Sequence, residues 1–553
     1  MKRRNFLKIF PAAGVTSFAV NGHAMRPFAN SKIARMMAGC EEVEDRVLVL
    51  IQLHGGNDGV NTVIPINQYD AYANLWPVIK VPDKGPEQYI KLDNTLPSAD
   101  QVGLHPVMTG FKNLYDRGWL NVVQAVGYES LNQLHFKSTD LWLSGGDGTP
   151  EKSNIRSGWM GRALAAMYPD VKGEPLPPDY LYPLGIQIGD PYPSLGFHTE
   201  TEHQNSINLY GQDPDGFYSL VQTIGGAPLL NVPDSEYGDE LAYIMGVENA
   251  VDKYSVYITQ AFNAGSNAIT SYPQTGLANQ LKTIARLVKG GCKTKIYLCS
   301  MGGFDTHGSQ IPPEGTILDG RHADLLRNLS DSIRTFYDDL DGMGLADKIV
   351  ACTFSEFGRC ARENGSAGTD HGTLAPMFVF GKGLSGGVHG TNVDLSNLAG
   401  DNQLQGQQFD YRQVFTTLLQ DWLGASNYVL EQTMFEGYMK MPILSSTYAV
   451  TPDCYVGPTS IFDPAPEQRA LTVYPNPASF RVQVSFRGRA AFGARLSLHS
   501  LGGALVSANK VSVQTGSNLY YLDVSQLPPG PYFVRLENSV SGAAEVVKLS
   551  VGR

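Results

Sequence analysis

The chain has 553 residues, a length typical of about three domains rather than of one. Its net charge of −11 argues against a nucleic acid as a partner, because phosphate binding requires a basic surface. Past the amino-terminal leader, no apolar run reaches the roughly 18 to 20 residues that span a bilayer. We therefore expect no transmembrane segment after removal of the leader.

Residues 1–45 are predicted to be an export signal and leader. Residues 1–8 are basic, a weakly apolar core follows, and Gly22-His23-Ala24 offers a cleavage site of small residues. The run Arg3-Arg4-Asn5-Phe6-Leu7-Lys8 is similar to a twin-arginine signal, the route that exports proteins already folded around a cofactor. An ordinary Sec signal is the alternative. Either signal predicts export to the periplasm.

Five apolar runs have the character of strands buried on both faces, as in a parallel sheet covered by helices. They span residues 46–53, 120–126, 294–299, 348–354 and 376–380. Helical patterns lie between several of them, at residues 107–117, 322–341 and 411–423. This alternation predicts an α/β domain over residues 46–445, built on a doubly wound, mostly parallel sheet.

Residues 165–290 form a long insertion between the second and third predicted strands. In doubly wound sheets, ligands bind beyond the carboxyl ends of the strands. We expect the insertion to form a cap or wall over that edge. The alternative is a structural elaboration remote from the site.

The composition changes near residue 446. Residues 446–470 contain several prolines and are predicted to be a linker. Residues 471–553 contain short runs of alternating apolar and polar residues, such as 481–486 and 495–498, separated by glycine-rich turns. This pattern predicts a small carboxy-terminal β-sandwich.

Acidic and imidazole side chains recur after the predicted strands. Asp58 follows the first strand, Asp305-Thr306-His307 follows the third, and Asp370-His371 and His389 come later. Read singly, each Asp is most often a turn or cap residue and each His a structural one. Carboxylates and neutral imidazoles together are ligands for divalent cations. The set therefore predicts a centre for one or two ions, with zinc, calcium, manganese or magnesium as the metal.

Candidate catalytic side chains lie near the second predicted strand. A nucleophile is expected at a helix start, where the helix amino terminus lowers its pKa and receives an anion. Ser138 is the first candidate, and Thr139 and Ser130 are the alternatives. His135 is predicted to serve as an acid or base, or to orient a ligand.

Two further candidates, Glu356 and Arg359, follow the fourth predicted strand. Glu356 is predicted to be a further metal ligand or a general acid. Arg359 is predicted to clamp a substrate anion through two hydrogen bonds. The alternative is a salt bridge between these two neighbours.

The motifs between residues 46 and about 425 resemble the superfamily of alkaline phosphatases, sulfatases and cofactor-independent phosphoglycerate mutases. More closely, they resemble its domain-of-unknown-function family 1501. The motifs are Leu53-His54-Gly55-Gly56-Asn57-Asp58-Gly59-Val60-Asn61-Thr62, Gly103-Leu104-His105-Pro106, His135-Phe136-Lys137-Ser138, Asp305-Thr306-His307, Phe354-Ser355-Glu356-Phe357-Gly358-Arg359 and Gly368-Thr369-Asp370-His371-Gly372.

The resemblance implies an alkaline-phosphatase-like fold with two metal sites. Asp58, Asp370 and His371 would hold one ion, and Asp305, His307 and His389 the other. The superfamily usually places the middle Asp and His four residues apart, whereas here they are two apart. No Cys-x-Pro-x-Arg sequence occurs, which argues against the formylglycine chemistry typical of sulfatases.

The predicted β-sandwich resembles the carboxy-terminal sorting domain of cargo for the type IX secretion system. The resemblance rests on Val473-Tyr474-Pro475-Asn476-Pro477, Leu501-Gly502-Gly503, Leu522-Asp523-Val524-Ser525 and Leu527-Pro528-Pro529-Gly530-Pro531-Tyr532-Phe533-Val534. It implies the type IX machinery as a partner and a final location at the cell surface or outside the cell. A carbohydrate-binding or adhesive β-sandwich is the alternative.

Together these patterns predict a secreted, metal-dependent hydrolase of phosphate or sulfate esters, acting on a small-molecule or polysaccharide ester. The alternative is a non-catalytic surface or carbohydrate-binding protein that keeps the alkaline-phosphatase-like fold. The number of candidate ligands favours the hydrolase, and the open identity of the nucleophile favours the alternative.

Overall fold

A computed structural model describes most of the chain. The described residues are 18–20, 23–25, 43, 45–168, 171, 180–199, 205–209, 254–450, and 471–552 with gaps at 475, 489–491, 502–503, 514–515 and 539–543. The twin-arginine-like run and most of the predicted linker lie outside them, as does the segment 210–253 of the predicted insertion. The chain divides into two compact units, Met1–Glu436 with Lys440–Pro458, and Gly437–Met439 with Thr459–Arg553.

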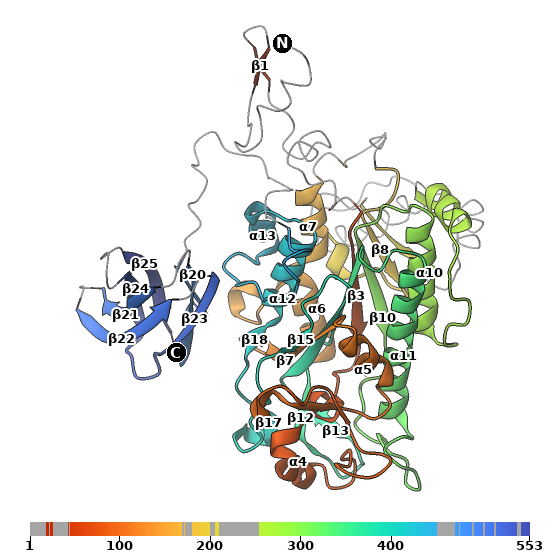
Figure 1. Ribbon diagram of the computed structural model, residues 1–553, viewed down its shortest axis with the longest axis horizontal. Coiled ribbons are helices and arrows are strands. Elements are labelled where there is room, and N and C mark those ends of the chain that lie inside the picture. The colour runs from red at the N-terminus through yellow and green to blue at the C-terminus, as the bar shows by residue number, and fades with distance from the viewer. Residues whose placement is uncertain are drawn as a thin grey trace. The chain divides into compact units, whose positions relative to one another are not determined.

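The first unit is built on a nine-stranded sheet (Figure 1). Its strands are β3 (Val47–Leu53), β7 (Leu120–Gly127), β8 (Gly185–Ile188), β9 (Ser206–Leu209), β10 (Ile296–Met301), β11 (Ile349–Phe354), β14 (Ala375–Phe380), β15 (Gly387–His389) and β18 (Phe409–Asp410). Their order is β15-β7-β14-β11-β3-β10-β8-β9, and β18 pairs with β7. β14 is antiparallel to β11 and β7, and the other pairs are parallel. The predicted α/β class and mostly parallel sheet are confirmed.

Helices cover both faces of this sheet (Figure 1). One group packs on the face to which Val49 and Ile51 of β3 point: α5 (Thr109–Asp116), α10 (Gly276–Lys289) and α11 (Arg321–Gly342). The other group comprises α6 (His135–Ser144), α7 (Trp159–Met167), α12 (Tyr411–Thr417) and α13 (Asn427–Thr433). On that side Phe354 of β11 stacks on Trp142 of α6. Strands with two covered faces explain the continuous apolar runs in the sequence.

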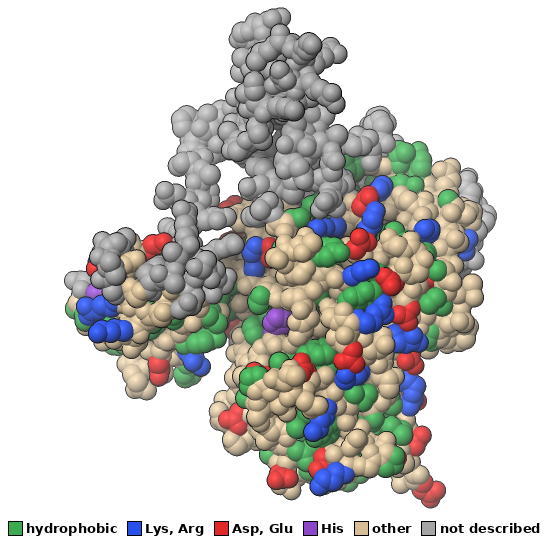
Figure 2. All heavy atoms as spheres, in the orientation of Figure 1, with side chains coloured by type: hydrophobic (Ala, Val, Ile, Leu, Met, Phe, Trp, Pro, Cys, Tyr) green, Lys and Arg blue, Asp and Glu red, His purple; other side chains and the backbone are tan. Residues whose placement is uncertain are grey.

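Helix α11 shows why the helical pattern of residues 322–341 is a reliable signal. Leu326, Leu329, Ile333, Phe336 and Leu340 are fully buried against the sheet, at intervals of three and four residues. Its outer side carries i, i+3 and i, i+4 ion pairs, Arg327 with Asp324 and Arg334 with Asp338. Figure 2 shows such acidic and basic side chains interspersed over the outer surface of the first unit.

Two features of the sheet were not expected from the sequence. Within the predicted insertion, the described residues include β8 and β9, which extend the main sheet next to β10. The run at residues 376–380 forms β14 as expected, but in the antiparallel direction. An isolated apolar run carries no information about strand direction, so the sequence alone did not predict this reversal.

Small elements surround one end of the sheet. They are α3 (Gly59–Thr62), α4 (Tyr69–Leu75), the three-stranded sheet of β4 (Val63–Pro65), β5 (Ile90–Lys91) and β6 (Val102–Leu104), the hairpin of β12 (Arg359–Glu363) and β13 (Thr369–His371), and the pair β16 (Leu398–Ala399) and β17 (Gln403–Leu404). Two short strands, β1 (Phe18–Val20) and β2 (His23–Met25), pair near the amino terminus. The α12 helix continues as a π-helical turn, Leu418–Trp422.

The second unit consists of two antiparallel sheets. One has the order β19-β20-β23 and the other β22-β21-β24-β25. Their bounds are β19 (Leu471–Tyr474), β20 (Arg481–Gly488), β21 (Phe492–Ser500), β22 (Leu505–Val513), β23 (Gly516–Asp523), β24 (Gly530–Asn538) and β25 (Ala544–Val551). Val484 from the first sheet and Leu496 and Val534 from the second share one apolar core. The predicted carboxy-terminal β-sandwich is confirmed.

Across the described part of the chain, we find no helix that combines the length and the apolar character needed to cross a bilayer.

Candidate metal centre

The candidate centre lies at the carboxyl ends of three neighbouring strands. β11, β3 and β10 are adjacent in the sheet, so the loops that leave them meet at one edge. These loops supply Glu356, the Gly55-Gly56 turn and Asp305. Gly55 has a φ of +120°, and a side-chain carbon there would collide with the backbone of Asp305. A glycine at this position therefore lets the β3 loop approach the β10 loop closely.

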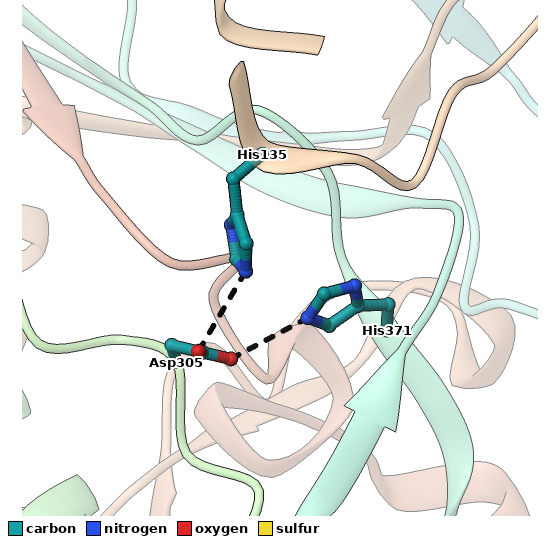
Figure 3. A group of neighbouring side chains, drawn as sticks. All are labelled: His135, Asp305 and His371. Carbon is teal, nitrogen blue, oxygen red and sulfur yellow. Dashed lines mark ion pairs between the residues drawn. The ribbon is translucent and has the colours of Figure 1, made fainter. Parts of the chain in front are cut away.

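Three side chains bring their donor atoms together at this edge (Figure 3). Each of His135, Asp305 and His371 offers one ligand atom, and these atoms lie within 4.8 Å of one another. Nε2 of His135 lies 3.7 Å from Oδ2 of Asp305, and Nε2 of His371 lies 3.5 Å from Oδ1. Figure 3 shows both rings pointing toward the Asp305 carboxylate, from the start of α6 and from the end of β13.

The two imidazole nitrogens that face Asp305 have no hydrogen-bond partner. Nε2 of His135 and Nε2 of His371 are both buried atoms without one. A buried polar atom left unpaired costs about 1–3 kcal/mol. Two such atoms directed at one carboxylate are explained by a cation that all three groups would bind. The residues present therefore fit a divalent metal.

The other nitrogen of each ring is fixed by a hydrogen bond. Nδ1 of His135 lies 2.8 Å from Oε1 of Glu356, and Nδ1 of His371 lies 2.8 Å from the carbonyl oxygen of Gln133. Both oxygens accept, so each Nδ1 carries the proton and each Nε2 presents its lone pair toward Asp305. Metal-binding histidines are oriented in this way by carboxylates and backbone carbonyls.

Arg359 is held entirely inside the protein. Its buried guanidinium donates to the carbonyl oxygens of Gly56 at 2.9 Å, Thr369 at 3.0 Å and Phe304 at 3.2 Å, and also to that of Gly55. It also donates to Oδ1 of Asp305 at 2.6 Å. A guanidinium with these partners fixes Asp305 and the glycine turn. This role differs from the predicted clamp on a substrate anion.

Asp305 is ionised in this setting. Burial raises the pKa of its carboxyl, but the hydrogen bond and charge of Arg359 and the nearby histidines outweigh burial and lower the pKa below its ordinary value. For His371, burial is the main cause that lowers the pKa, and Arg359 adds to it. An ionised carboxylate and a neutral imidazole are the forms that bind a cation.

The hairpin β12–β13 connects Arg359 with His371. The two residues are directly opposite each other in its register. Its first strand follows Glu356 after a short turn, and its second strand ends at His371. One two-stranded element thus carries both a candidate ligand and the residue that fixes Asp305.

Glu356 and Ser138 are buried residues whose hydrogen bonds hold the side chains and loops of the site in place. Glu356 is buried, and its Oε1 accepts the backbone N–H of Gly55 at 2.8 Å as well as the proton of His135. Ser138 is also buried; its hydroxyl donates to the backbone carbonyl of Glu356 and lies 2.7 Å from the hydroxyl of Tyr128. Glu356 therefore orients His135. The hydroxyl of Ser138 is occupied by these hydrogen bonds, which does not fit the nucleophile that the sequence predicts.

His307 and Asp370 form a more exposed layer beside the cluster. Nε2 of His307 lies 3.1 Å from Oδ1 of Asp305, and its Nδ1 lies 3.0 Å from Oδ1 of Asp370. Asn364 donates to the same Asp370 oxygen at 3.0 Å, and this hydrogen bond is the main cause of a lowered Asp370 pKa. The carboxylate of Asp370 thus contacts His307, whose ring in turn contacts Asp305.

Asp58 and His389 have other partners. Oδ1 of Asp58 caps α3 by accepting the N–H of Asn61 at 3.2 Å, and Oδ2 accepts from Gln310 at 3.1 Å. His389 lies in β15, with its Nε2 3.0 Å from Oδ1 of Asn121. The structure therefore groups the predicted ligands differently from the two sets that the resemblance implies. It joins one member of each set, Asp305 and His371, with His135.

The sequence predicts His135 only as an acid, a base or a residue that orients a ligand. Its position as the first residue of a helix that follows a buried strand was visible in the sequence. Because His135 and Asp305 are far apart in the sequence, no local pattern reveals their contact. The hydrogen bond that orients His371 goes to the backbone carbonyl of Gln133, and no sequence pattern reveals it either.

The burial of Asp58 leads to a testable pH effect. Burial raises the pKa of its carboxyl from 3.8 to about 6, so the folded state binds this proton more tightly than the unfolded state. The resulting stabilisation is complete below about pH 4 and is lost as the pH rises through about 6. Each pKa unit corresponds to about 1.4 kcal/mol, so the loss reaches about 3 kcal/mol.

We expect Asp58→Asn to gain about 3 kcal/mol relative to the wild type between pH 4 and pH 8, because an amide has no such loss. Urea unfolding of both proteins across this pH range measures the difference. A stability difference that does not change with pH would contradict a buried, protonatable Asp58. If the variant lost its bound metal, Asp58 would be a metal ligand, as the resemblance implies.

Two models of known protein families match the chain. The model of a protein family of unknown function, DUF1501, matches residues 263–421, and that of a secretion system C-terminal sorting domain matches residues 472–550. The DUF1501 segment contains Asp305 and His371 but not His135. The sorting domain implies export and a location at the cell surface or outside the cell.

No curated protein matches the chain. A structure of PorZ, a surface component of the type-IX secretion system of Porphyromonas gingivalis, is 20% identical over 16% of this chain and 12% of its own, with a TM-score of 0.12. Three β-glucosidase structures, two of them from Listeria innocua and one from Erythrobacter marinus, are matched over 15–16% of their chains. This chain thus spans less than a fifth of the length of these structures.

Two solved structures are matched over more of the chain. A protein of the alkaline phosphatase superfamily from Vibrio parahaemolyticus is 9% identical over 91% of this chain and 82% of its own, with a TM-score of 0.29. The lipoteichoic acid synthase LtaP from Listeria monocytogenes is 9% identical over 76% of this chain and 78% of its own, with a TM-score of 0.27.

Proposed function

We propose that the chain is an exported, metal-dependent hydrolase of phosphate or sulfate esters. The observation that carries this proposal is the pair of unpartnered imidazole nitrogens, on His135 and His371, that face the carboxylate of Asp305. The motif resemblance to alkaline phosphatases and sulfatases supports the reaction class, and the sorting-domain match supports export by the type IX route.

His135, Asp305 and His371 would hold the cation. When bound, such an ion supplies positive charge to a developing oxyanion and lowers the pKa of water. Two imidazoles and one carboxylate favour zinc or another transition metal, because calcium and magnesium sites are built mainly from oxygen ligands. Of the four metals that the sequence predicts as alternatives, this donor set therefore favours zinc and manganese over calcium and magnesium.

The remaining residues have separate tasks in this proposal. Glu356 keeps the Nδ1 proton on His135, and Arg359 holds Asp305 in place. His307 is half exposed beside the cluster, with its Nε2 near Asp305 and its Nδ1 paired with Asp370, so it is the candidate general acid of the site. Ser138 has a supporting role, since its hydroxyl is bonded to the Glu356 carbonyl.

The test is metal analysis of the purified full chain, with hydrolysis of p-nitrophenyl phosphate and p-nitrophenyl sulfate before and after a chelator. We expect bound zinc or manganese, loss of hydrolysis after chelation, and recovery when the same ion is returned. Calcium and magnesium, added in the same way, are the matched controls and should restore little activity. Hydrolysis that survives chelation would contradict the proposal, and recovery with magnesium alone would contradict the preference for a transition metal.

The buried Ser138 hydroxyl favours a second candidate function, that of a metal-holding surface protein that binds its ligand without turnover. The same experiment separates the two. Bound metal without hydrolysis of either ester would support the binding protein and remove the hydrolase.

A further inference from the structure

A cavity of about 590 Å³ opens on one side of the candidate centre. Its floor is the sheet face near the strand ends, where Gln52 of β3 pairs with Ser300 of β10, and Leu298 of β10 pairs with Gln187 of β8. Residues of α6 and of the loop at residues 190–195 line its sides. His135, Asp305 and Glu356 also line it. The volume is typical of a site for a small molecule or for part of a larger one.

The loop wall is held to the floor by Gln187. Its Nε2 donates to the carbonyl oxygen of Tyr192 at 2.7 Å, and its Oε1 accepts the N–H of Ser194 at 2.6 Å. Asp190 accepts the N–H of Tyr192 at 3.0 Å. This wall is therefore built by specific hydrogen bonds, which gives the cavity a defined shape.

One donor on the floor of the cavity lacks a partner. Gln52 is only 3% exposed, and its Nε2 has no hydrogen-bond partner. Its side chain lines the cavity. An unpaired buried amide costs about 1–3 kcal/mol, so this group calls for an oxygen acceptor from a ligand.

The charged side chains that line the cavity include carboxylates but no described lysine or arginine. Asp305 is paired with Arg359, and Glu356 accepts from Gly55 and lies against His135. Asp190 remains as an acceptor for a hydroxyl group of a ligand. A cavity without a lysine or arginine offers no cation that would bind several phosphate groups.

Two aromatic side chains border the cavity, one on α6 and one on the loop. Phe136 on α6 is 90% exposed, and Tyr192 on the loop is 77% exposed. Large apolar side chains this exposed at a cavity usually serve a ligand, because they lose no surface to the protein core. Flat rings suit the C–H face of another ring.

We infer that this cavity binds the uncharged, hydroxyl-bearing ring of a saccharide, which presents its ester group to the metal centre. Gln52 donates to a ring or hydroxyl oxygen, Asp190 accepts from a hydroxyl, and the ring packs on Phe136 or Tyr192. The position of the ester rests on the proposed function, whereas the recognition of the ring does not. We expect no binding of polyphosphates, because no described residue that lines the cavity is a lysine or an arginine.

The test is binding by the full chain as purified, and by full-chain His371→Ala, which removes a candidate metal ligand. Each protein is titrated calorimetrically with maltotriose, cellotriose, mannotriose and xylotriose, and with tripolyphosphate as the polyanion. We expect at least one trisaccharide to bind both proteins. Gln52→Leu and Phe136→Ala should each weaken that binding about tenfold or more.

Phe480→Ala is the comparison, since Phe480 is an aromatic residue that is 76% exposed and lines a separate pocket in the second unit, so a loss of affinity in this variant would place the saccharide there and overturn the inference. Phe480→Ala should leave the affinity unchanged. Phe136→Ala alters only the surface, so its effect stays interpretable even where Gln52→Leu disturbs folding. Failure of all four trisaccharides to bind, stronger binding of tripolyphosphate by His371→Ala, or unchanged affinity in Phe136→Ala would overturn the inference.

The outcomes also separate this inference from the proposed function. Trisaccharide binding by a protein that hydrolyses no ester would retain the saccharide site and remove the hydrolase. Hydrolysis of p-nitrophenyl phosphate without trisaccharide binding would do the reverse.

Discussion

Replacing His371 with alanine is expected to remove the bound metal and, with it, ester hydrolysis. The substitution deletes one of three donor atoms that lie within 4.8 Å of one another. Changes to residues that only orient a ligand typically weaken metal affinity by about 10- to 100-fold. Loss of a ligand itself should exceed this, so we expect metal affinity to fall by more than about 100-fold.

The matched control is His389→Ala, which changes the same residue type in the same unit. The His389 ring contacts Asn121 in the main sheet, so this variant should keep its metal. Metal content after equilibrium dialysis, measured by mass spectrometry, compares the two, and circular dichroism checks the fold. Equal metal loss in both variants would restore the two-site grouping that the resemblance implies, and would contradict the single cluster.

Replacing Arg359 with methionine is expected to lower the free energy of unfolding far more than replacing an arginine on the protein surface. The guanidinium is fully buried and donates to Asp305, which is 46% exposed, and to backbone carbonyls of two loops and of β13. Each buried carbonyl oxygen left without a partner costs about 1–3 kcal/mol, so we expect a total loss of about 3 kcal/mol or more. Unfolding in urea, followed by tryptophan fluorescence, measures this loss.

Arg334→Met provides the comparison for this variant. Arg334 forms an ion pair with Asp338 on the exposed side of α11, where such pairs contribute about 0–1 kcal/mol. If Arg359→Met unfolds at the same urea concentration as Arg334→Met, then the buried network around Asp305 does not stabilise the fold as described. If Arg359→Met is as stable as the wild type but loses its metal, then Arg359 positions Asp305 in the centre and does not stabilise the fold.

Much of the fold could be predicted because the strands are buried on both faces. Residues 46–53 and 348–354 are continuous apolar runs, and they form the neighbouring strands β3 and β11. The short strands β15 and β18 contain three and two residues, too few for any periodicity to appear. The direction of β14 depends on where the chain returns to the sheet, which no local pattern records.

The candidate site was predictable as a set of residue types but not as a set of contacts. Asp305 and His371 stand out because they follow buried strands within short motifs. Arg359 also stands out in the sequence, and its charge suggests a clamp for a substrate anion. The structure shows instead that its guanidinium donates to surrounding backbone carbonyl oxygens. Ser138 has the position expected of a nucleophile at a helix start, but the burial of its hydroxyl arises from tertiary packing.

The register shift within the hairpin of β12 and β13 has a consequence for the chemistry. Residues 359–363 are paired with only residues 369–371, so Arg359 and His371 are opposite each other because β12 holds two extra residues. Side chains alternate between the two sides of a strand, so deleting one residue between Arg359 and Glu363 would change which side chain is opposite His371. A one-residue change in this ribbon would thus uncouple Arg359 from His371 while every proposed ligand remained in the sequence.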